Sequence, residues 1–231
     1  MNSFYLPEIK DGINFLSPEE SKHAVKVLRL KSGDSIQILD GKGGNYTVEI
    51  NEANHKKTFF SILDKEQQKA SSHYIHIAIA PTKNIDRIEW FVEKAVEIGI
   101  HEISFIVCKN SERKVLKIDR IHRKAVSAMK QSMNTFLPKI NELTSYEDFL
   151  QNIAATEKYI AFVDFENPIQ LKNVITPKNN YCILIGPEGD FTIDELNQAI
   201  DLDFQKVSLG NSRLRTETAG IIACHFFQFI Q

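Results

Sequence analysis

Two loops in the C-terminal half of the chain combine residue types that could bind a charged small molecule. The first, GPEGDFT (residues 186–192), follows an apolar stretch and opens a helix through the capping-box pattern TIDE (residues 192–195). The second, LGNSRLRTETA (residues 209–219), places two arginines just ahead of a threonine that can start a helix. Glycines in both loops let a backbone approach a ligand closely.

The acidic residues of the first loop indicate which ligand it could take. It matches neither the dinucleotide fingerprint nor the P-loop, and Glu188 and Asp190 would repel a phosphate. A cationic ligand without phosphate, such as the sulfonium and ammonium of S-adenosylmethionine, suits it better. Taken alone, however, the residues of this loop favour a tight strand-to-helix turn that binds nothing. Two other classes stay open: an RNA-binding KH module, whose GXXG loop clamps phosphates, and a nucleotide-binding α/β enzyme, which normally carries a P-loop lysine.

The arginines of the second loop suggest chemistry at its helix start. Arg213 and Arg215 gain nothing from the dipole there, since it favours negative charge. We therefore expect them to contact a base or phosphate, or to stabilise developing negative charge. For Arg213 a salt bridge to an acidic neighbour is the alternative. Glu217 could accept a proton or simply interact favourably with the first turn of the helix.

The elements around these loops predict an α/β fold for residues 73–231. Strands are expected at 74–80, 103–107, 159–163, 181–185 and 206–209, with helices at 85–98 and 118–133. Such alternation indicates a mostly parallel sheet, in which ligands bind beyond the carboxyl ends of the strands. Residues 219–230 are apolar nearly all round, so we expect this last helix to be buried between two subunits of a dimer.

The first 68 residues have a different rhythm and predict a small strand-rich domain. A capping box with proline, SPEE (residues 17–20), opens a helix through about Lys26. Short strands are expected at 35–39, 45–50 and 59–63, separated by turn residues, as in a small barrel. The polar stretch at 64–73 is interpreted as a linker.

Composition excludes several classes of protein. The chain has 231 residues, a net charge of −2 and 42% hydrophobic residues, which is typical of a soluble globular protein of one or two domains. The stretch MNSFYLPEIKDG (residues 1–12) lacks a basic segment followed by an apolar one, so we expect no secretory signal, and no apolar run reaches membrane-spanning length. Its three cysteines lack metal or redox spacing, so we expect a cytoplasmic protein without metal. Residues 109–130 carry eight basic and two acidic residues, which could bind RNA or form a solvated helix face.

The two loops together resemble a known signature. GPEGDFT and LGNSRLRTETAG are similar to the motifs of the RsmE family, the 16S ribosomal RNA uracil-1498 N3-methyltransferases of the SPOUT class. HAVKVLRL (residues 23–30), PTKNIDRIEWFVEKAVEIGI (81–100), NSER (110–113) and MKQSMNTFLPKI (129–140) resemble further blocks in the same order. Asp190 stands where a glycine is common in the family, and Asn134 where an arginine often occurs.

The resemblance implies a PUA-like β-barrel over residues 1–68 and a SPOUT methyltransferase domain with a trefoil knot over residues 73–231. It also implies a homodimer that methylates N3 of a uridine in the RNA of the small ribosomal subunit. By motif, the residues implied to bind S-adenosylmethionine are Leu184, Ile185, Gly186, Pro187, Glu188, Gly189, Leu209, Gly210, Arg213, Leu214, Arg215 and Thr216. Arg215 and Glu217 are the catalytic candidates; RNA contacts are expected from Lys26, Arg29, Lys83, Arg87, Arg113 and Arg123.

Overall fold

The computed structural model describes residues 2–164, 166 and 168–231, which form two compact units. The first comprises the chain up to Ala70 together with Val126–Leu137, and the second comprises Ser71–Ala125 and Pro138–Gln231. Helix α3 (Ile118–Ser132) therefore begins in the second unit and ends in the first.

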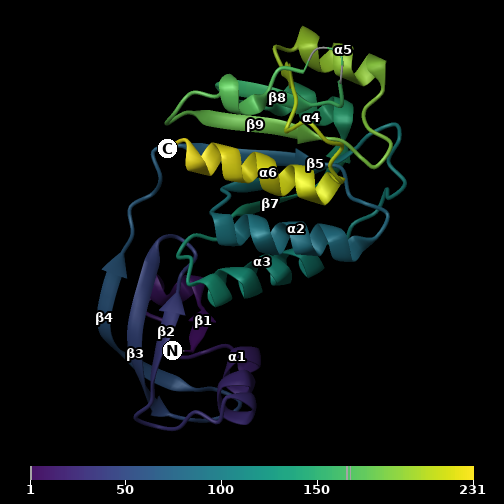
Figure 1. Ribbon diagram of the computed structural model, residues 1–231. Coiled ribbons are helices and arrows are strands. Elements are labelled where there is room, and N and C mark those ends of the chain that lie inside the picture. Colours follow the sequence, from purple (N-terminus) through teal and green to yellow (C-terminus); the bar gives the residue numbers. More distant parts are fainter. Residues whose placement is uncertain (1, 165, 167) are drawn as a thin grey trace. The chain divides into compact units, whose positions relative to one another are not determined.

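The first unit contains a four-stranded sheet and a short helix (Figure 1). The strands are β1 (Ser3–Tyr5), β2 (Ser35–Leu39), β3 (Gly44–Glu52) and β4 (Phe59–Gln67). Neighbours pair in chain order, and Phe15 forms a further antiparallel bridge with Phe59. Helix α1 (Pro18–Lys22) starts at Ser17, whose hydroxyl accepts the Glu20 backbone N–H, and continues as a π-helical turn over His23–Val27. The inward residues of the strands pack with this helix into one core.

The second unit is a six-stranded sheet in which every neighbouring pair of strands is parallel. Its strands, in the order in which they lie side by side, are β10 (Gln205–Val207), β8 (Glu157–Ala161), β9 (Asn180–Ile185), β5 (Tyr74–Ile79), β6 (Glu102–Val107) and β7 (Lys139–Ser145). All carboxyl ends therefore lie along one edge, so the loops after β5, β8, β9 and β10 are brought together.

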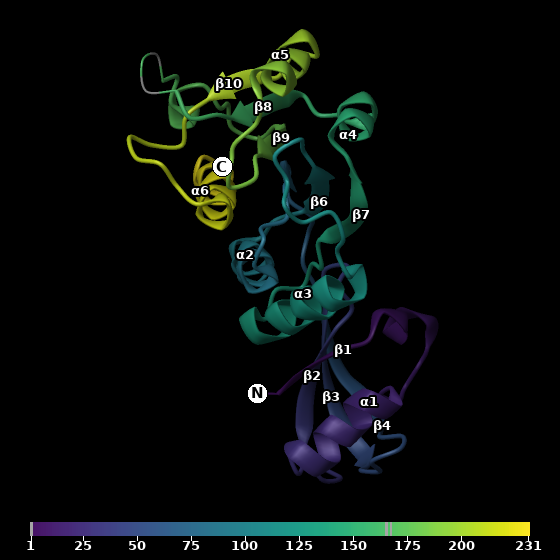
Figure 2. The same ribbon diagram turned by 90° about the vertical axis from the view of Figure 1, so that its right-hand side faces the viewer.

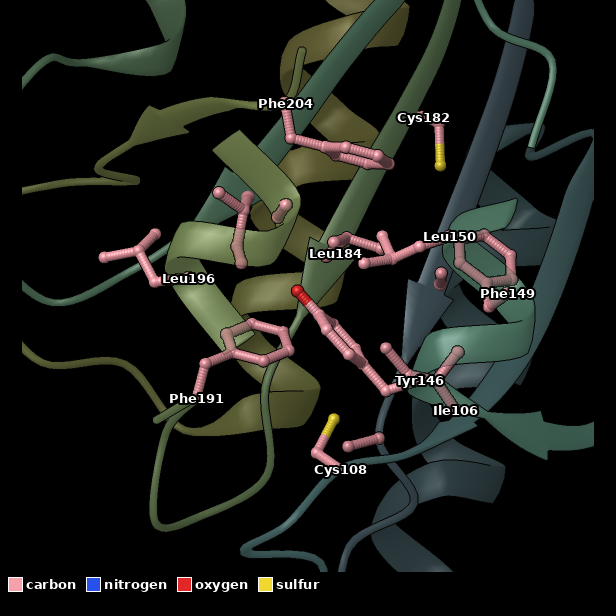
Figure 3. Packing of buried hydrophobic residues seen from close by; sticks show 14 residues of the cluster. Ile106, Cys108, Tyr146, Phe149, Leu150, Cys182, Leu184, Phe191, Leu196 and Phe204 are labelled. Atoms are coloured by element: carbon pink, nitrogen blue, oxygen red, sulfur yellow. The ribbon is translucent and has the colours of Figure 1, made fainter. Parts of the chain in front are cut away.

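Helices cover both faces of this sheet (Figure 2). On one face lie α2 (Ile85–Ile98) and α6 (Thr216–Phe229), and α6 contacts β5, β9 and α2. Gly220 permits this approach, because a Cβ there would lie 2.6 Å from the Phe91 ring. On the other face, α4 (Tyr146–Asn152) and α5 (Ile193–Asp201) share a hydrophobic core with the strands (Figure 3).

The structure corrects several expected boundaries. The predicted linker at 64–73 begins too early, because β4 continues to Gln67 and pairs with β3 along its length. Strands β1 and β7 and helix α4 were not predicted. β7 is an edge strand whose residues are only partly buried, so it lacks the continuous apolar run that marks the central strands. The trefoil knot stays a prediction from the resemblance.

Candidate functional site

A cavity of about 580 Å³ opens at the carboxyl edge of the sheet, within the second unit. Its walls come from the segments that follow β8, β9 and β10, from the start of α6, and from Arg87 of α2. This volume lies in the range of pockets that enclose a small organic molecule. The parallel sheet thus gathers loops that are far apart in the sequence into one site.

Most residues implied to bind the cofactor line this cavity. They are Ile185, Gly186, Pro187, Glu188, Leu209, Gly210, Arg213, Leu214, Arg215 and Thr216. Leu184 and Gly189 are not part of the lining that the described residues form. Leu184 is buried in the core beneath α4 and α5. At Gly189, an added Cβ would lie 3.2 Å from the Cβ of Asn110, so this glycine makes room for a protein side chain.

The two sequence motifs are joined directly. The Thr216 hydroxyl donates to the Gly186 carbonyl oxygen at 3.0 Å, and Nη2 of Arg213 lies 3.4 Å from the Glu188 carbonyl oxygen. The far end of the first loop is fixed by the capping box, in which the Thr192 hydroxyl accepts from the Glu195 N–H while the Glu195 carboxylate accepts from the Thr192 N–H. The loops are thus held by their own polar groups.

A third wall of the cavity was not predicted. It consists of Ala161, the last residue of β8, and of Phe162, Val163, Asp164 and Pro168, which follow this strand. Since a strand had been expected at 159–163 and sites form at carboxyl ends of strands, the signal was present. The sequence did not indicate that β8 and β9 are adjacent strands, which the structure shows.

The two catalytic candidates occupy different environments. Arg215 is exposed, lines the cavity and stands at the N-cap position of α6. Glu217 is buried and is not among the described residues that line the cavity. Its Oε1 lies 3.8 Å from Nε of Arg87, and its Oε2 has no hydrogen-bond partner in the described part of the chain. Arg87 therefore connects Glu217 to the cavity.

Asp190 connects two walls of the cavity. Its carboxylate accepts hydrogen bonds from the backbone N–H groups of Phe191, at 2.8 Å, and Val163, at 3.2 Å. Its φ is 60°, in the left-handed region that glycine adopts most readily and that Asp tolerates better than most residues. Burial raises the pKa of this carboxyl despite the two N–H donors and the nearby Arg213.

Two of the expected RNA-binding residues, Arg113 and the exposed Lys83, already interact with other parts of the protein. Arg113 donates to the carbonyl oxygens of Thr82, at 3.0 Å, and Lys83, at 2.5 Å, so its guanidinium already holds a loop of the protein. The Lys83 ammonium pairs with Glu112 at 2.9 Å. Lys26 and Arg29 in the first unit and Arg123 in α3 are also exposed. Arg29 also has a positive φ of 57°, at the end of the π-helical turn.

The lining fits S-adenosylmethionine by its chemistry. Apolar groups of Phe162, Leu209 and Leu214 offer a surface for a flat aromatic base. Carboxylates of Glu188 and Asp190 suit the cationic sulfonium and ammonium, while arginines suit a carboxylate. In the part of the chain that the structure describes, no group of His, Cys, Asp and Glu residues could hold a metal ion. No helix among the described residues is long and apolar enough to cross a membrane.

Comparison with known proteins places this site in a family. Residues 48–228 match the model of an RNA methyltransferase domain, and residues 16–63 match the model of an RNA methyltransferase PUA domain. A relative from Borreliella burgdorferi, ribosomal RNA small subunit methyltransferase E 1, is 30% identical over 94% of this chain and 92% of its own length. The chain belongs to the ribosomal RNA small subunit methyltransferase E family. A relative of that name from Mesomycoplasma hyopneumoniae is 29% identical over 96% of both chains.

Solved structures agree with this family. A probable rRNA-methyltransferase from Porphyromonas gingivalis superposes with a TM-score of 0.92 at 38% identity, covering 100% of this chain and 98% of the other. Methyltransferase E from Neisseria gonorrhoeae, crystallised bound to S-adenosyl methionine, gives a TM-score of 0.88 at 26% identity and covers 99% and 97%. The resemblance to the RsmE family and the expected pairing of a PUA-like with a methyltransferase domain are thereby confirmed.

Proposed function

We propose that this protein transfers a methyl group from S-adenosylmethionine to N3 of a uridine in 16S ribosomal RNA, at position 1498 by family resemblance. The observation that carries the proposal is the cavity in which the two family motifs meet. Its acidic and apolar groups suit the cofactor, and Arg215 stands at its wall. When bound, the cofactor supplies an electrophilic methyl group.

The chain's own residues must make N3 nucleophilic. N3 of neutral uridine carries a proton, and losing it places negative charge on the uracil oxygens. An arginine at the cavity wall can donate hydrogen bonds to those oxygens, which is the role we assign to Arg215. The base must also leave its stack before its Watson–Crick edge can reach the site.

Glu217 is the remaining candidate for proton transfer. Its carboxylate is buried and pairs with Arg87, which itself lines the cavity. Because Glu217 is not part of the cavity lining that the described residues form, a base in the cavity would not contact its carboxylate directly. We therefore rank Glu217 below Arg215, and propose that the Arg87–Glu217 pair holds Arg87 at the cavity wall.

We further propose how the protein is organised around this reaction. The N-terminal domain, residues 1–68, binds RNA phosphates through Lys26 and Arg29, and the domain over residues 73–231 carries out catalysis, with RNA contacts from Lys83, Arg87, Arg113 and Arg123. We place the protein in the cytoplasm and propose that it is a homodimer. The exposed apolar side chains of α2 and α6 support the dimer. Trp90 is 45% and Phe229 80% exposed, which suits burial against a second copy.

The test is mass-spectrometric mapping of modified nucleosides in 16S ribosomal RNA. A strain lacking the gene should lose 3-methyluridine at one position, and the parent gene should restore it while the Arg215→Ala gene should not. In parallel, calorimetry on the purified protein should show binding of S-adenosylmethionine. Binding of RNA alone, or of a phosphorylated nucleotide alone, would contradict the proposal.

A further inference from the structure

The loops that follow β5, β6 and β9 at the carboxyl edge of the sheet are tied to one another by hydrogen bonds that involve polar side chains, and the segment 108–113, which follows β6, takes part in most of them. Arg113 holds the carbonyl oxygens of Thr82 and Lys83, in the loop that follows β5. The Lys83 N–H in turn donates to Oε1 of Glu188, in the loop that follows β9, at 3.0 Å. The Lys109 N–H donates to Oε1 of Glu195 at 2.8 Å, at the start of α5.

Asn110 makes the most direct connection to the wall of the cavity. Its Nδ2 lies 3.2 Å from the Gly189 carbonyl oxygen and 3.1 Å from the Asp190 carbonyl oxygen. Because carbonyl oxygens only accept hydrogen bonds, the amide nitrogen is the atom that must face them. The Cβ of Asn110 also lies beside Gly189, where an added Cβ would approach it to 3.2 Å, a tight contact.

The backbone that Asn110 holds is one that would not form readily by itself. Asp190 has a left-handed φ of 60°, and such a conformation persists in a non-glycine residue only where surrounding contacts fix it. The Asp190 N–H donates to the Pro187 carbonyl oxygen at 2.9 Å, and its carboxylate holds Phe191 and Val163. Asn110 adds the contacts on the carbonyl side, so the turn is held from both ends.

We propose that Asn110 is a positioning residue for the cofactor: its side-chain amide fixes the turn at Gly189 and Asp190, so that the neighbouring groups line the cavity before the ligand arrives. This inference rests on the proposed function. Asn110 itself lies outside the cavity lining that the described residues form, so it acts through the turn and not by touching the ligand. Preorganisation of this kind strengthens binding because the loop has less freedom to lose.

The test compares three single variants by calorimetry with S-adenosylmethionine and by steady-state methylation. Asn110→Ala removes the amide. Asn110→Asp keeps the size of the side chain but presents only acceptors to two carbonyl oxygens. Glu112→Gln, two residues along the same segment, is the matched control, because Glu112 is exposed and its ion pair is with Lys83, not with the turn at Gly189 and Asp190.

We expect Asn110→Ala to raise the Kd for S-adenosylmethionine about tenfold, which corresponds to about 1.4 kcal/mol. Asn110→Asp should weaken binding at least as much, although it is nearly isosteric. In both variants the KM for the cofactor should rise while kcat at saturation stays near that of the parent. Glu112→Gln should bind as the parent does.

Parent-like affinity of Asn110→Asp would overturn the inference, because a role in packing alone tolerates this replacement. A tenfold fall in kcat in the Asn110 variants, without a change in the Kd for S-adenosylmethionine, would also overturn it. Failure of the parent protein to bind S-adenosylmethionine would instead contradict the proposed function. Thermal unfolding of each variant identifies a general loss of folding, in which case Asn110→Ser, a shorter hydroxyl donor, replaces Asn110→Asp and should keep part of the affinity.

Discussion

The Thr216 hydroxyl donates a 3.0 Å hydrogen bond to the carbonyl oxygen of Gly186, 30 residues earlier in the chain. This single contact joins the loop after β9 to the first turn of α6. Both residues line the cavity, and Thr216 is buried. The distance between the two loops, and hence the width of the site, is therefore fixed by a group that belongs to the site.

Replacing Thr216 with valine should weaken cofactor binding, because the Gly186 carbonyl loses its donor while the volume of the side chain is kept. We expect a rise in the Kd for S-adenosylmethionine of about tenfold, typical of losing one buried hydrogen bond. Thr216→Ser retains the hydroxyl and should bind nearly as the parent does. Equal Kd values for the valine and serine variants by calorimetry would show that this hydrogen bond does not contribute to cofactor binding.

Arg215 should matter for the chemical step more than for cofactor affinity. Arg215→Ala should lower the single-turnover rate about 100-fold, as is typical for loss of one donor to a developing oxyanion. Arg215→Lys should recover only part of the rate, since a lysine lacks the planar fork of donors. A single-turnover rate equal to the parent's in Arg215→Ala would exclude Arg215 from the mechanism.

Glu217→Gln separates proton transfer from positioning. If Glu217 only holds Arg87, glutamine should reduce the rate a few-fold, leave the shape of the pH–rate profile unchanged and raise the KM for RNA. Arg87→Met should then have a similar effect, and the double variant should cost little more than either single one, because the residues act as one pair. If Glu217→Gln alone lost the acidic limb of the pH–rate profile, where a general base becomes protonated, this would indicate that the carboxylate accepts the proton after all.

The stability of the second unit should fall as the solution becomes acidic. Burial lowers the pKa of His76 to about 4; the nearby Glu102 carboxylate raises this pKa, and the Lys139 ammonium lowers it. Burial also lowers the pKa of His101 to about 4, and the nearby His73 acts in the same direction. His76 also bonds Ser104 at 2.8 Å and packs edge-on against Phe149. In the unfolded chain these rings take up protons near pH 6.5, so the unfolded state binds more protons between about pH 6.5 and 4.

The free energy of unfolding should therefore be fully retained above pH 6.5 and decrease as the pH falls from there toward 4. Urea denaturation at pH 7.5, 6 and 5 measures the slope. In the double variant His76→Gln/His101→Gln the slope over this range should be shallower than in the parent. An unchanged slope would show that other groups dominate the acid response.

The basic residues of the first unit should determine how strongly RNA binding depends on salt. Lys26→Gln/Arg29→Gln removes two exposed cations, so the slope of log K against log salt should become less steep by one to two. Lys172→Gln, which removes an exposed cation of the second unit, is the control. Cofactor affinity should stay unchanged in both variants. A salt slope equal to the parent's would mean that these two residues do not contact phosphates.

The sequence by itself determined the fold class and most of the wall of the cavity. Continuous apolar runs such as 181–185 mark strands buried on both faces, and a glycine-rich or arginine-rich loop directly after such a run marks the ligand edge. These signals are local, because a few adjacent residues carry both the element and the loop. For the same reason the N-cap at Ser17 and the capping box at Thr192 marked the starts of their helices correctly.

The tertiary structure decided which residues meet. The strand order places β8 beside β9 and so adds residues 161–164 to the cavity. No local pattern in the sequence indicates that these two strands are adjacent. The tertiary structure buried Glu217 beside Arg87, whereas Arg215, the extended N-cap residue of α6, lines the cavity. It also brought Asn110 against Gly189, 79 residues later, since contacts between loops depend on how the strands are ordered and packed.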